Sequence, residues 1–519
     1  MNASLKRCII TIMNAFLQLP PPRLRILTVR RVQSWIARVL SALIVLGASF
    51  AWAANYHVAM TGDDTHPGTE AQPWRTLGKA NSAAQSGDVI NIGPGTWPER
   101  PTIPRAGTAS SPITWRGTGD TTIVGGFNIR HDHIHIRNFR VDYLNSGAAG
   151  VIAIGEGNDN KTTGLSGNYV IVDNVTFTRQ GSTALNVAGN FPHYTGPIGS
   201  ICRNSRFYDC STGSAVGISA SQFVLENSTF TSNKGGDAIM LFGRNNTVRG
   251  CQFLNWSRPA GSTQHTDLFQ SFSTNGQISE GHIIEGNFAY NCNETQLGNV
   301  DHVGEPARIK DWTFRNNIFV RVSNPFNLFA PGFKFHNNSF FRSPYGAGSC
   351  VILFAAAKGV ASNTSIINNL FYKGGYDEAS NTQGFYAFNI SSGYSLAGLS
   401  IDNNLVIGSG AGTIKDATWT WYNANKNGFN GIDPRFVNAV NPTKPEDLRL
   451  LANSPAIGKG RNLSELFTTD FSGRLRGTKW DIGAFQSGKV LGAPGGFRTE
   501  ESTVFNWVDG LWGRLAAAD

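Results

Sequence analysis

The sequence predicts an all-β protein, a right-handed parallel β-helix with a short capping helix near its N-terminus. Three observations lead to this expectation. The chain of 519 residues contains 59 Gly and is only 15% charged, a composition typical of many short strands and turns. An Asn-x-x-Phe motif recurs along the chain, and alternating apolar residues precede it.

Each repeat has an Asn or Gly anchor, followed three residues later by Phe or another apolar residue. The shortest intervals between anchors are 21 to 23 residues, the length of one bare coil, and longer intervals indicate inserted loops. Because Asn and Gly tolerate positive φ, each anchor is expected to form a tight turn. We expect the Asn side chains to form an inward-facing ladder, with Phe230, Phe319 and Phe340 buried behind it. The ten anchors are Asn138, Asn174, Asn204, Asn227, Gly250, Gly286, Asn316, Asn337, Asn368 and Asn403.

The segments before the anchors alternate with a period of two, as a strand with one buried face requires. Phe333 and Phe335 precede Asn337 in this way, and Leu399 and Ile401 precede Asn403. Stacked coils would place these apolar residues in interior columns.

The first 53 residues have the features of a cleavable signal peptide. They hold seven of the 44 Lys and Arg residues and no Asp or Glu, so 44 less seven leaves 37 basic against 35 acidic residues in the rest of the chain. An apolar run from Val39 to Phe50 precedes Ala51-Trp52-Ala53, which has the small-x-small cleavage pattern. A permanent anchor is the alternative, but the run is short for a membrane span. The nearly neutral remainder does not indicate nucleic-acid binding.

A solenoid needs caps, because both of its ends expose an apolar cross-section. Thr76 is expected to N-cap a short helix through Ala84, whose Leu77 and Ala80 would face the first coil. Five cysteines follow the leader without a regular spacing, which argues against a disulfide framework. Cys202 falls at an inward position of the repeat, and we expect it to be a buried free thiol.

Two stretches resemble the ends of bacterial secreted β-helix proteins, among them several pectate and alginate lyases. The first contains Asp63-Asp64, Pro67-Gly68-Thr69 and Pro73-Trp74, and the second contains Ser454-Pro455-Ala456-Ile457 and Asp481-Ile482-Gly483-Ala484-Phe485. This resemblance implies the β-helix fold. It says little about the chemistry, because the group also includes hydrolases, epimerases and proteins with no known activity. The expected organisation is a signal peptide at 1–53, a cap with the first coils at 54–130, the β-helix at 131–440, a closing segment at 441–487 and a tail at 488–519.

Candidate site residues gather in two consecutive long insertions, between the anchors at 250, 286 and 316. Chemistry at a uronic-acid polymer needs a base to remove the proton next to the carboxylate and a cation to stabilise the charge that develops. We assign Lys310, His302, Arg308 and His265 to catalysis, Asp237, Glu305 and Trp256 to substrate binding, and Asp267 and Asp301 to a possible Ca²⁺. Each has a simpler structural reading, such as a turn carboxylate for Asp237 or a solvated charge for Arg308 and Lys310.

The function expected from these residues is that of a polysaccharide lyase that cleaves a uronic-acid polymer by β-elimination. A glycoside hydrolase or epimerase on the same scaffold, and a glycan-binding surface protein without catalysis, are the alternatives. We expect a secreted or periplasmic monomer with a polysaccharide as its partner, no nucleic acid, and no stable membrane insertion after signal cleavage.

Overall fold

The computed structural model describes residues 53–488, with gaps. The residues outside the description within this range are 143–150, 156–166, 179–182, 190–196, 211–212, 232–234, 262–265, 274–276, 293–297, 301–307, 324–325, 344–347, 354–362, 374–375, 378–381, 384, 391–394 and 408–424. The expected signal peptide and tail lie outside the described residues, apart from Ala53 and Gly488. No helix in the described part is long and apolar enough to cross a membrane.

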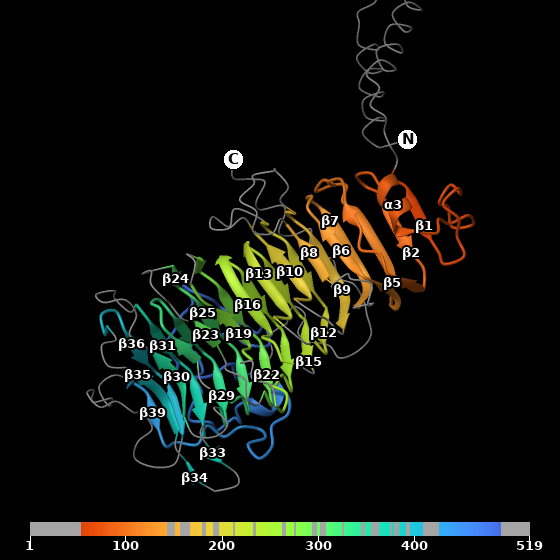
Figure 1. Cartoon of the computed structure of the whole chain (residues 1–519). Helices are drawn as coiled ribbons and strands as arrows, with labels where there is room; N and C mark the ends of the chain where they lie inside the picture. Colours follow the sequence, from red (N-terminus) through yellow and green to blue (C-terminus); the bar gives the residue numbers. More distant parts are fainter. Residues whose placement is uncertain are drawn as a thin grey trace, which may run out of the picture. The chain divides into compact units, whose positions relative to one another are not determined.

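The described strands form a parallel β-helix, as the sequence predicts. Two long sheets run the length of the stack, and within each sheet a strand pairs in parallel with its equivalent in the next coil (Figure 1). We call the 24-stranded sheet A and the 13-stranded sheet B. Each complete coil contributes two short strands to sheet A, separated by the turn at the anchor, and one strand to sheet B.

The strands of sheet A fall into two tracks. The first coils contribute β1 (Asn55–Val58), β2 (Val89–Ile92), β3 (Gly95–Trp97), β5 (Ile113–Val124), β7 (Ile134–Asp142) and β9 (Ile171–Thr178). Track 1, before the anchor turn, continues with β11 (Ile201–Arg203), β14 (Val224–Glu226), β17 (Thr247–Arg249), β21 (Ile283–Glu285), β25 (Thr313–Arg315), β28 (Lys334–His336), β31 (Ser365–Ile367), β36 (Ser400–Asp402) and β38 (Asn425–Lys426). Track 2, after the turn, consists of β12 (Arg206–Tyr208), β15 (Thr229–Thr231), β18 (Gln252–Leu254), β22 (Phe288–Tyr290), β26 (Ile318–Val320), β29 (Ser339–Phe341), β32 (Leu370–Tyr372), β37 (Leu405–Ile407) and β39 (Phe429–Asn430).

Sheet B forms the face between track 2 of one coil and track 1 of the next. Its strands lie side by side in Figure 1. They are β4 (Thr102–Ile103), β6 (Gly126–Ile129), β8 (Val151–Ile154), β10 (Leu185–Ala188), β13 (Val216–Ser221), β16 (Ile239–Arg244), β19 (Phe269–Ser271), β20 (Ser279–Glu280), β23 (Gly298–Val300), β24 (Ile309–Lys310), β27 (Phe326–Leu328), β30 (Gly348–Leu353) and β35 (Phe385–Ile390). A separate antiparallel pair, β33 (Tyr376–Asp377) and β34 (Thr382–Gln383), lies outside both sheets.

The anchor turns have the expected backbone, but the inward ladder is formed one residue later than predicted. Asn227 and Asn316 have φ of 49° and 55°, which is the left-handed region expected of them. The Asn227 side chain nevertheless faces outward and is exposed. The residue after each anchor points inward, because a strand that leaves a left-handed turn directs its next side chain into the coil.

The inner ladder therefore consists of Asn287, Asn317, Asn338, Asn369 and Asn404, all almost fully buried. Asn338 shows the pattern, since its Oδ1 accepts hydrogen bonds from the backbone N–H (3.0 Å) and the Nδ2 (2.9 Å) of Asn317. Its own Nδ2 donates to the carbonyl of Phe314 at 2.8 Å and to Oδ1 of Asn369 at 2.9 Å. Each amide thus satisfies backbone and side-chain groups of adjacent coils that have no access to water.

The Phe residues of the repeat stack behind this turn, as predicted. Phe207, Phe230 and Phe253 stack with ring centroids 4.6 and 4.8 Å apart, and Phe319 and Phe340 stack at 5.0 Å. The parallel register of track 2 places these rings directly above one another. Their burial, with Phe230, Phe319 and Phe340 at most 1% exposed, confirms the core position assigned to them.

The N-terminal cap and the cysteines also agree with the prediction. Helix α3 (Leu77–Ala83) begins after Thr76, whose side chain accepts a hydrogen bond from the backbone N–H of Lys79 at 3.0 Å. Leu77 and Ala80 are fully buried. Cys202 and the four cysteines that follow it are buried free thiols.

The C-terminal segment, residues 431–488, packs along the outer side of track 2. It contains the 3-10 helix η3 (Pro445–Leu448) and, shown in blue in Figure 1, it lies beside β22 and β29. An apolar cluster joins the two. Its strand members are Phe288, Ile318, Val320, Phe341, Leu370, Tyr372 and Leu405, and its members from the C-terminal segment are Phe436, Leu448, Ala456, Phe471, Ile482, Ala484 and Phe485.

The outward-facing anchors fasten this segment to the coils. Asn316 Nδ2 donates to the carbonyl of Thr469 at 2.8 Å, and Asn337 Nδ2 donates to the carbonyls of Asp481 and Gly483. Arg476 is fully buried and donates to Asn316 Oδ1 at 2.7 Å. Burial lowers the pKa of Arg476 to about 10, and the carboxylates of Asp470 and Asp481 oppose this shift.

Replacing Phe319 with Ala is expected to lower the free energy of unfolding by about 3–5 kcal/mol, because it removes a buried ring from the stack and leaves a cavity. Denaturant unfolding followed by far-ultraviolet circular dichroism measures this change. Leu475→Ala, at a side chain that is 70% exposed, is the control and should change stability by less than about 0.5 kcal/mol. Equal effects of the two substitutions would contradict the stacked core.

The burial of His282 leads us to expect a lower free energy of unfolding in mild acid. It is fully buried, with Nδ1 accepting the backbone N–H of Asn246 at 3.2 Å and Nε2 3.1 Å from Oγ of Ser279. Burial lowers the pKa of His282 from 6.5 to about 3. Between these two pH values His282 is protonated in the unfolded chain but neutral in the folded protein. Its contribution to the free energy of unfolding is therefore fully present above pH 6.5 and is lost as the pH falls towards 3.

The measurement is the free energy of unfolding between pH 6.5 and 4.5, where His282 should contribute a slope of about 1.4 kcal/mol per pH unit. His282→Asn is the matched variant, because Asn246 occupies the equivalent position of the preceding coil and accepts the same kind of hydrogen bond. The variant should show a smaller slope by that amount. An unchanged slope would show that His282 is accessible to protons in the folded state.

Candidate functional site

Five of the nine predicted site residues lie in the described part of the chain. These are Asp237, Trp256, Asp267, Arg308 and Lys310, whereas His265, Asp301, His302 and Glu305 fall outside the described residues.

Asp237 and Asp267 form a buried pair at the start of two adjacent strands of sheet B. They precede β16 and β19 by two residues, and these strands pair with Ile239 opposite Phe269. Asp237 Oδ1 accepts the backbone N–H of Asp267 at 2.8 Å, and the side chains of the two residues are 7% and 0% exposed. Asp267, assigned from the sequence to a possible Ca²⁺, thus lies wholly inside the fold.

Trp256 was expected to stack on a sugar ring, and the structure corrects this assignment. Its side chain is fully buried, and its ring packs edge-on against Phe230 with the centroids 5.9 Å apart. A ring in this position has no access to a ligand. It belongs to the core behind the anchor turn.

Lys310 lies at the other end of sheet B, in a group that we call the basic edge: Arg244, Glu280, Arg308 and Lys310. The register sets Arg244, Glu280 and Lys310 level on three consecutive coils. Glu280 accepts from Arg244 Nε at 2.6 Å and lies 3.6 Å from Lys310 Nζ. Arg308 lies two residues before Lys310, directly ahead of β24. The edge therefore holds Glu280 between two cations of neighbouring coils, with Arg308 next to them along the chain.

The buried carboxylates and the basic edge are separated by the length of β16. Asp237 and Arg244 are seven residues apart along an extended strand, which corresponds to roughly 23 Å. Side chains that far apart do not meet at one atom of a substrate. The predicted cluster is thus two groups, of which the basic edge is the one in contact with solvent: the Arg244 and Lys310 side chains are each 37% exposed.

The calcium site receives no support from the described residues. Asp301 falls outside the described residues, so its distance from Asp267 stays a prediction. Within the described ranges, no three His, Cys, Asp or Glu side chains come together in a way that would hold a metal ion. The side chain of Asp267 is buried rather than presented to a cleft.

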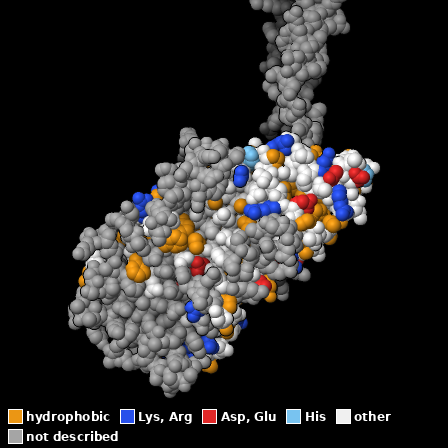
Figure 2. All heavy atoms as spheres, in the orientation of Figure 1, with side chains coloured by type: hydrophobic (Ala, Val, Ile, Leu, Met, Phe, Trp, Pro, Cys, Tyr) orange, Lys and Arg blue, Asp and Glu red, His pale blue; other side chains and the backbone are white. Residues whose placement is uncertain are grey.

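Between the two groups, the outer face of sheet B presents an uncharged row. The register aligns Asn186, Gly217, Met240, Gln270 and Asn327 in this row, in which Gln270 is buried and Asn186 is exposed. Amides both donate and accept hydrogen bonds, which suits them to hydroxyl-rich ligands. On the face shown in Figure 2, the described basic side chains are scattered among acidic, polar and apolar ones.

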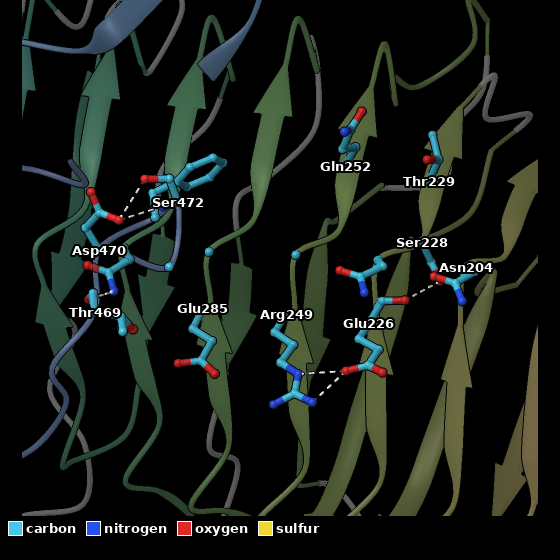
Figure 3. A pocket seen from close by; sticks show the side chains of 16 residues that line it. Asn204, Glu226, Ser228, Thr229, Arg249, Gln252, Glu285, Thr469, Asp470 and Ser472 are labelled. Atoms are coloured by element: carbon cyan, nitrogen blue, oxygen red, sulfur yellow. Dashed lines mark hydrogen bonds and ion pairs between the residues drawn. The ribbon is translucent and has the colours of Figure 1, made fainter. Parts of the chain in front are cut away.

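A second candidate site, a groove on sheet A, contains none of the nine predicted residues. It follows the anchor turns from Asn204 to Asn316 and has a volume of about 770 Å³. In Figure 3 one side is formed by the row Glu226, Arg249 and Glu285, and the other by Thr229 and Gln252. Residues 469–473 of the C-terminal segment close one end.

Two glycine anchors widen this groove. Gly250 and Gly286 stand where the other coils have Asn, and both have positive φ, 62° and 61°. At Gly286 an added Cβ would meet only the carbonyl oxygen of Phe471, at 3.9 Å. The groove forms because these two consecutive turns carry no side chain and because the C-terminal segment covers the row of anchors only as far as residues 469–473.

Each charged side chain that lines the groove is bound by a neighbouring group. Arg249 donates through Nε (2.8 Å) and Nη2 (2.6 Å) to Glu226 Oε2, and Glu285 is bound by Arg315 at 2.6 Å. The carboxylate of Asp470 accepts hydrogen bonds from the backbone N–H groups of Ser472, Arg474 and Gln486. The groove is therefore polar and weakly acidic, because the described residues Glu226, Glu285 and Asp470 line it together with one cation, Arg249.

Comparisons with known proteins gave one short family match and several distant structural similarities. Residues 60–102 match a family described as "Protein of unknown function (DUF1565)", and no curated protein matches the chain. A solved structure of the pectate lyase Pel9A is 16% identical, covers 85% of this chain and 98% of its own, and has a TM-score of 0.45. The complex of XylC with xylose is 11% identical, with coverage of 83% and 98% and a TM-score of 0.40. An alginate lyase from Paenibacillus sp. str. FPU-7 is 15% identical, with coverage of 60% and 97% and a TM-score of 0.37. These similarities concern the β-helix, which the strand register establishes independently, and they do not assign a chemistry to this chain.

Proposed function

We propose that this protein is a secreted or periplasmic polysaccharide lyase that acts on a uronic-acid polymer across the outer face of sheet B. The observation that supports the proposal is the basic edge, in which Glu280 lies level with Arg244 and Lys310 on three consecutive coils and Arg308 lies two residues before Lys310. Cationic side chains of this kind can bind the carboxylates of the polymer, and the amides of the neighbouring row can supply hydrogen bonds to its hydroxyls.

The reaction that fits this edge is β-elimination. A base removes the proton next to the uronate carboxylate, the bond to the neighbouring glycosidic oxygen breaks, and an unsaturated sugar end forms. Lys310 is paired with Glu280, so its ammonium suits neutralisation of the carboxylate better than proton removal. We therefore propose that Lys310 and Arg308 bind the uronate, and that His265 or His302 supplies the base, with Glu305 as a substrate-binding residue.

A glycoside hydrolase needs two accessible carboxyl groups on either side of the scissile bond. Asp237 and Asp267 do not meet this need, because both are buried. A glycan-binding protein without catalysis would use the same amide row, and the assay below separates it from a lyase.

The test is an assay of residues 54–519 against polygalacturonate, alginate and other uronate polymers, with and without a chelator. Lyase action produces an unsaturated sugar end that absorbs in the ultraviolet, hydrolysis produces reducing ends without this absorbance, and a binding protein produces neither. Replacing Lys310 with Ala should lower kcat/KM at least about 100-fold, because the developing negative charge loses its cation.

Lys459→Ala, at an exposed lysine of the C-terminal segment, is the matched control and should keep full activity. Loss of activity with the chelator would assign a cation to the reaction. Reducing ends without ultraviolet absorbance, or full activity of the Lys310 variant, would contradict the proposal.

A further inference from the structure

The groove on sheet A lies on the same line of anchors that holds the C-terminal segment. Downstream, the outward anchors Asn316, Asn337 and Asn368 donate to carbonyl groups of that segment. Upstream, from Asn204 to Gly250, the line continues without the segment, which reaches the end of the groove beside Gly286. Within the described part of the chain, the side-chain amides of Asn227 and Gln252 make no hydrogen bond. The groove therefore presents hydrogen-bonding groups that are in place and unused.

The outer side of track 2 changes character where the groove begins. In the covered coils most outward positions of this row are apolar, namely Phe288, Ile318, Leu370 and Leu405, and Ser339 is the polar one. In the coils of the groove the same positions are Thr229 and Gln252. The part of track 2 that the C-terminal segment does not cover is thus polar at these positions, which suits the binding of a hydroxyl-rich ligand.

We propose that this groove is a second glycan-binding site, for an uncharged polysaccharide chain that runs along the axis of the coils. Sugar hydroxyls donate and accept hydrogen bonds, and the groove offers acceptors in Glu226 and Glu285 and donors in Arg249, Asn227 and Gln252. Among the described residues that line the groove, Arg249 is the one cation, and it is paired with Glu226. A polyanion would therefore find no unpaired cation among these residues, and its carboxylates would lie against those already present.

The repeat of the coils matches the repeat of such a chain. Adjacent coils lie about 4.8 Å apart, close to the length of one pyranose residue in an extended polymer. The groove follows five anchors, or four steps, which corresponds to about 19 Å. Equivalent side chains on consecutive coils would therefore meet consecutive sugar residues. The volume of about 770 Å³ is in the range of small-ligand sites.

This site does not depend on the proposed lyase activity, because it shares no residue with sheet B. Its test is a binding measurement on a microarray of plant and microbial glycans, followed by affinity gel electrophoresis with soluble xylan, galactomannan and β-glucan. The informative variant is Gly286→Asn. The φ of Gly286 is that of the Asn anchors, an added Cβ meets no close atom, and the new side chain would stand in the groove.

Gly431→Asn is the matched control, since Gly431 has φ of 72°, has open space around it and does not line the groove. We expect the unmodified protein to bind at least one uncharged polysaccharide, Gly286→Asn to weaken this binding at least about tenfold, and Gly431→Asn to leave it unchanged. Lyase activity on uronate polymers should be the same in all three proteins. Binding confined to charged glycans, no binding, or binding that Gly286→Asn does not weaken would overturn the proposal.

Discussion

The inner ladder of Asn amides is the interaction on which the rest of the fold depends. At each anchor turn the chain bends sharply between two strands, and the backbone N–H after the anchor is buried away from water. An unsatisfied group there would cost about 1–3 kcal/mol. In the coils from Cys251 onward the Asn of the next coil removes this cost by accepting the N–H, as Asn338 does for Asn317 and Asn369 does for Asn338. In the preceding coils the hydroxyl groups of Ser205 and Ser228 accept the equivalent N–H groups. Since each acceptor reaches its donor only when adjacent turns are level, these inward side chains hold the coils in register.

The outer surfaces follow from that register. With the turns level, the outward positions of track 1 form a row in which charges alternate from coil to coil: Asp173, Arg203, Glu226, Arg249, Glu285 and Arg315. The same register brings Arg244, Glu280 and Lys310 together on sheet B, although they are far apart in sequence. It also aligns the apolar outward positions of track 2 that the C-terminal segment covers. Both candidate sites thus depend on the inward side chains at the turns, because these keep the coils level and so align the outward residues of each site.

The sequence was sufficient for the fold because the fold is periodic. Ten anchors, with Phe230, Phe319 and Phe340 at a constant offset, specify coil length, turn geometry and core. The ladder was placed one residue too early, since an Asn-Asn pair such as 337–338 does not reveal which amide turns inward, and only the left-handed φ of the first residue decides this.

The candidate site was less predictable because it depends on contacts between coils. The density of charged residues between 265 and 310 was visible in the sequence. It does not show that Asp267 lies just before a strand of sheet B, whereas Lys310 lies at the end of another strand of that sheet. The sequence does not show whether the ring of Trp256 points into the core or towards solvent, so it could not distinguish a core residue from a residue that stacks on a ligand. The sequence contained one indication of the groove, the Gly anchors at 250 and 286. The residues that close its end, 469–473, lie some two hundred residues later and could not be connected with it from the sequence.

Amide hydrogen exchange at single-residue resolution tests the central claim most directly. If the buried ladder holds the register, the backbone N–H groups of Asn317, Asn338 and Asn369 should exchange only through global unfolding and be among the slowest in the protein. Their exchange should be far slower than that of exposed amides such as Thr65 and Ser464, which bond only to a side chain two residues away. Exchange of the ladder amides at the rate of these exposed groups would contradict the account, because the turns would then open independently of the coils they are said to align.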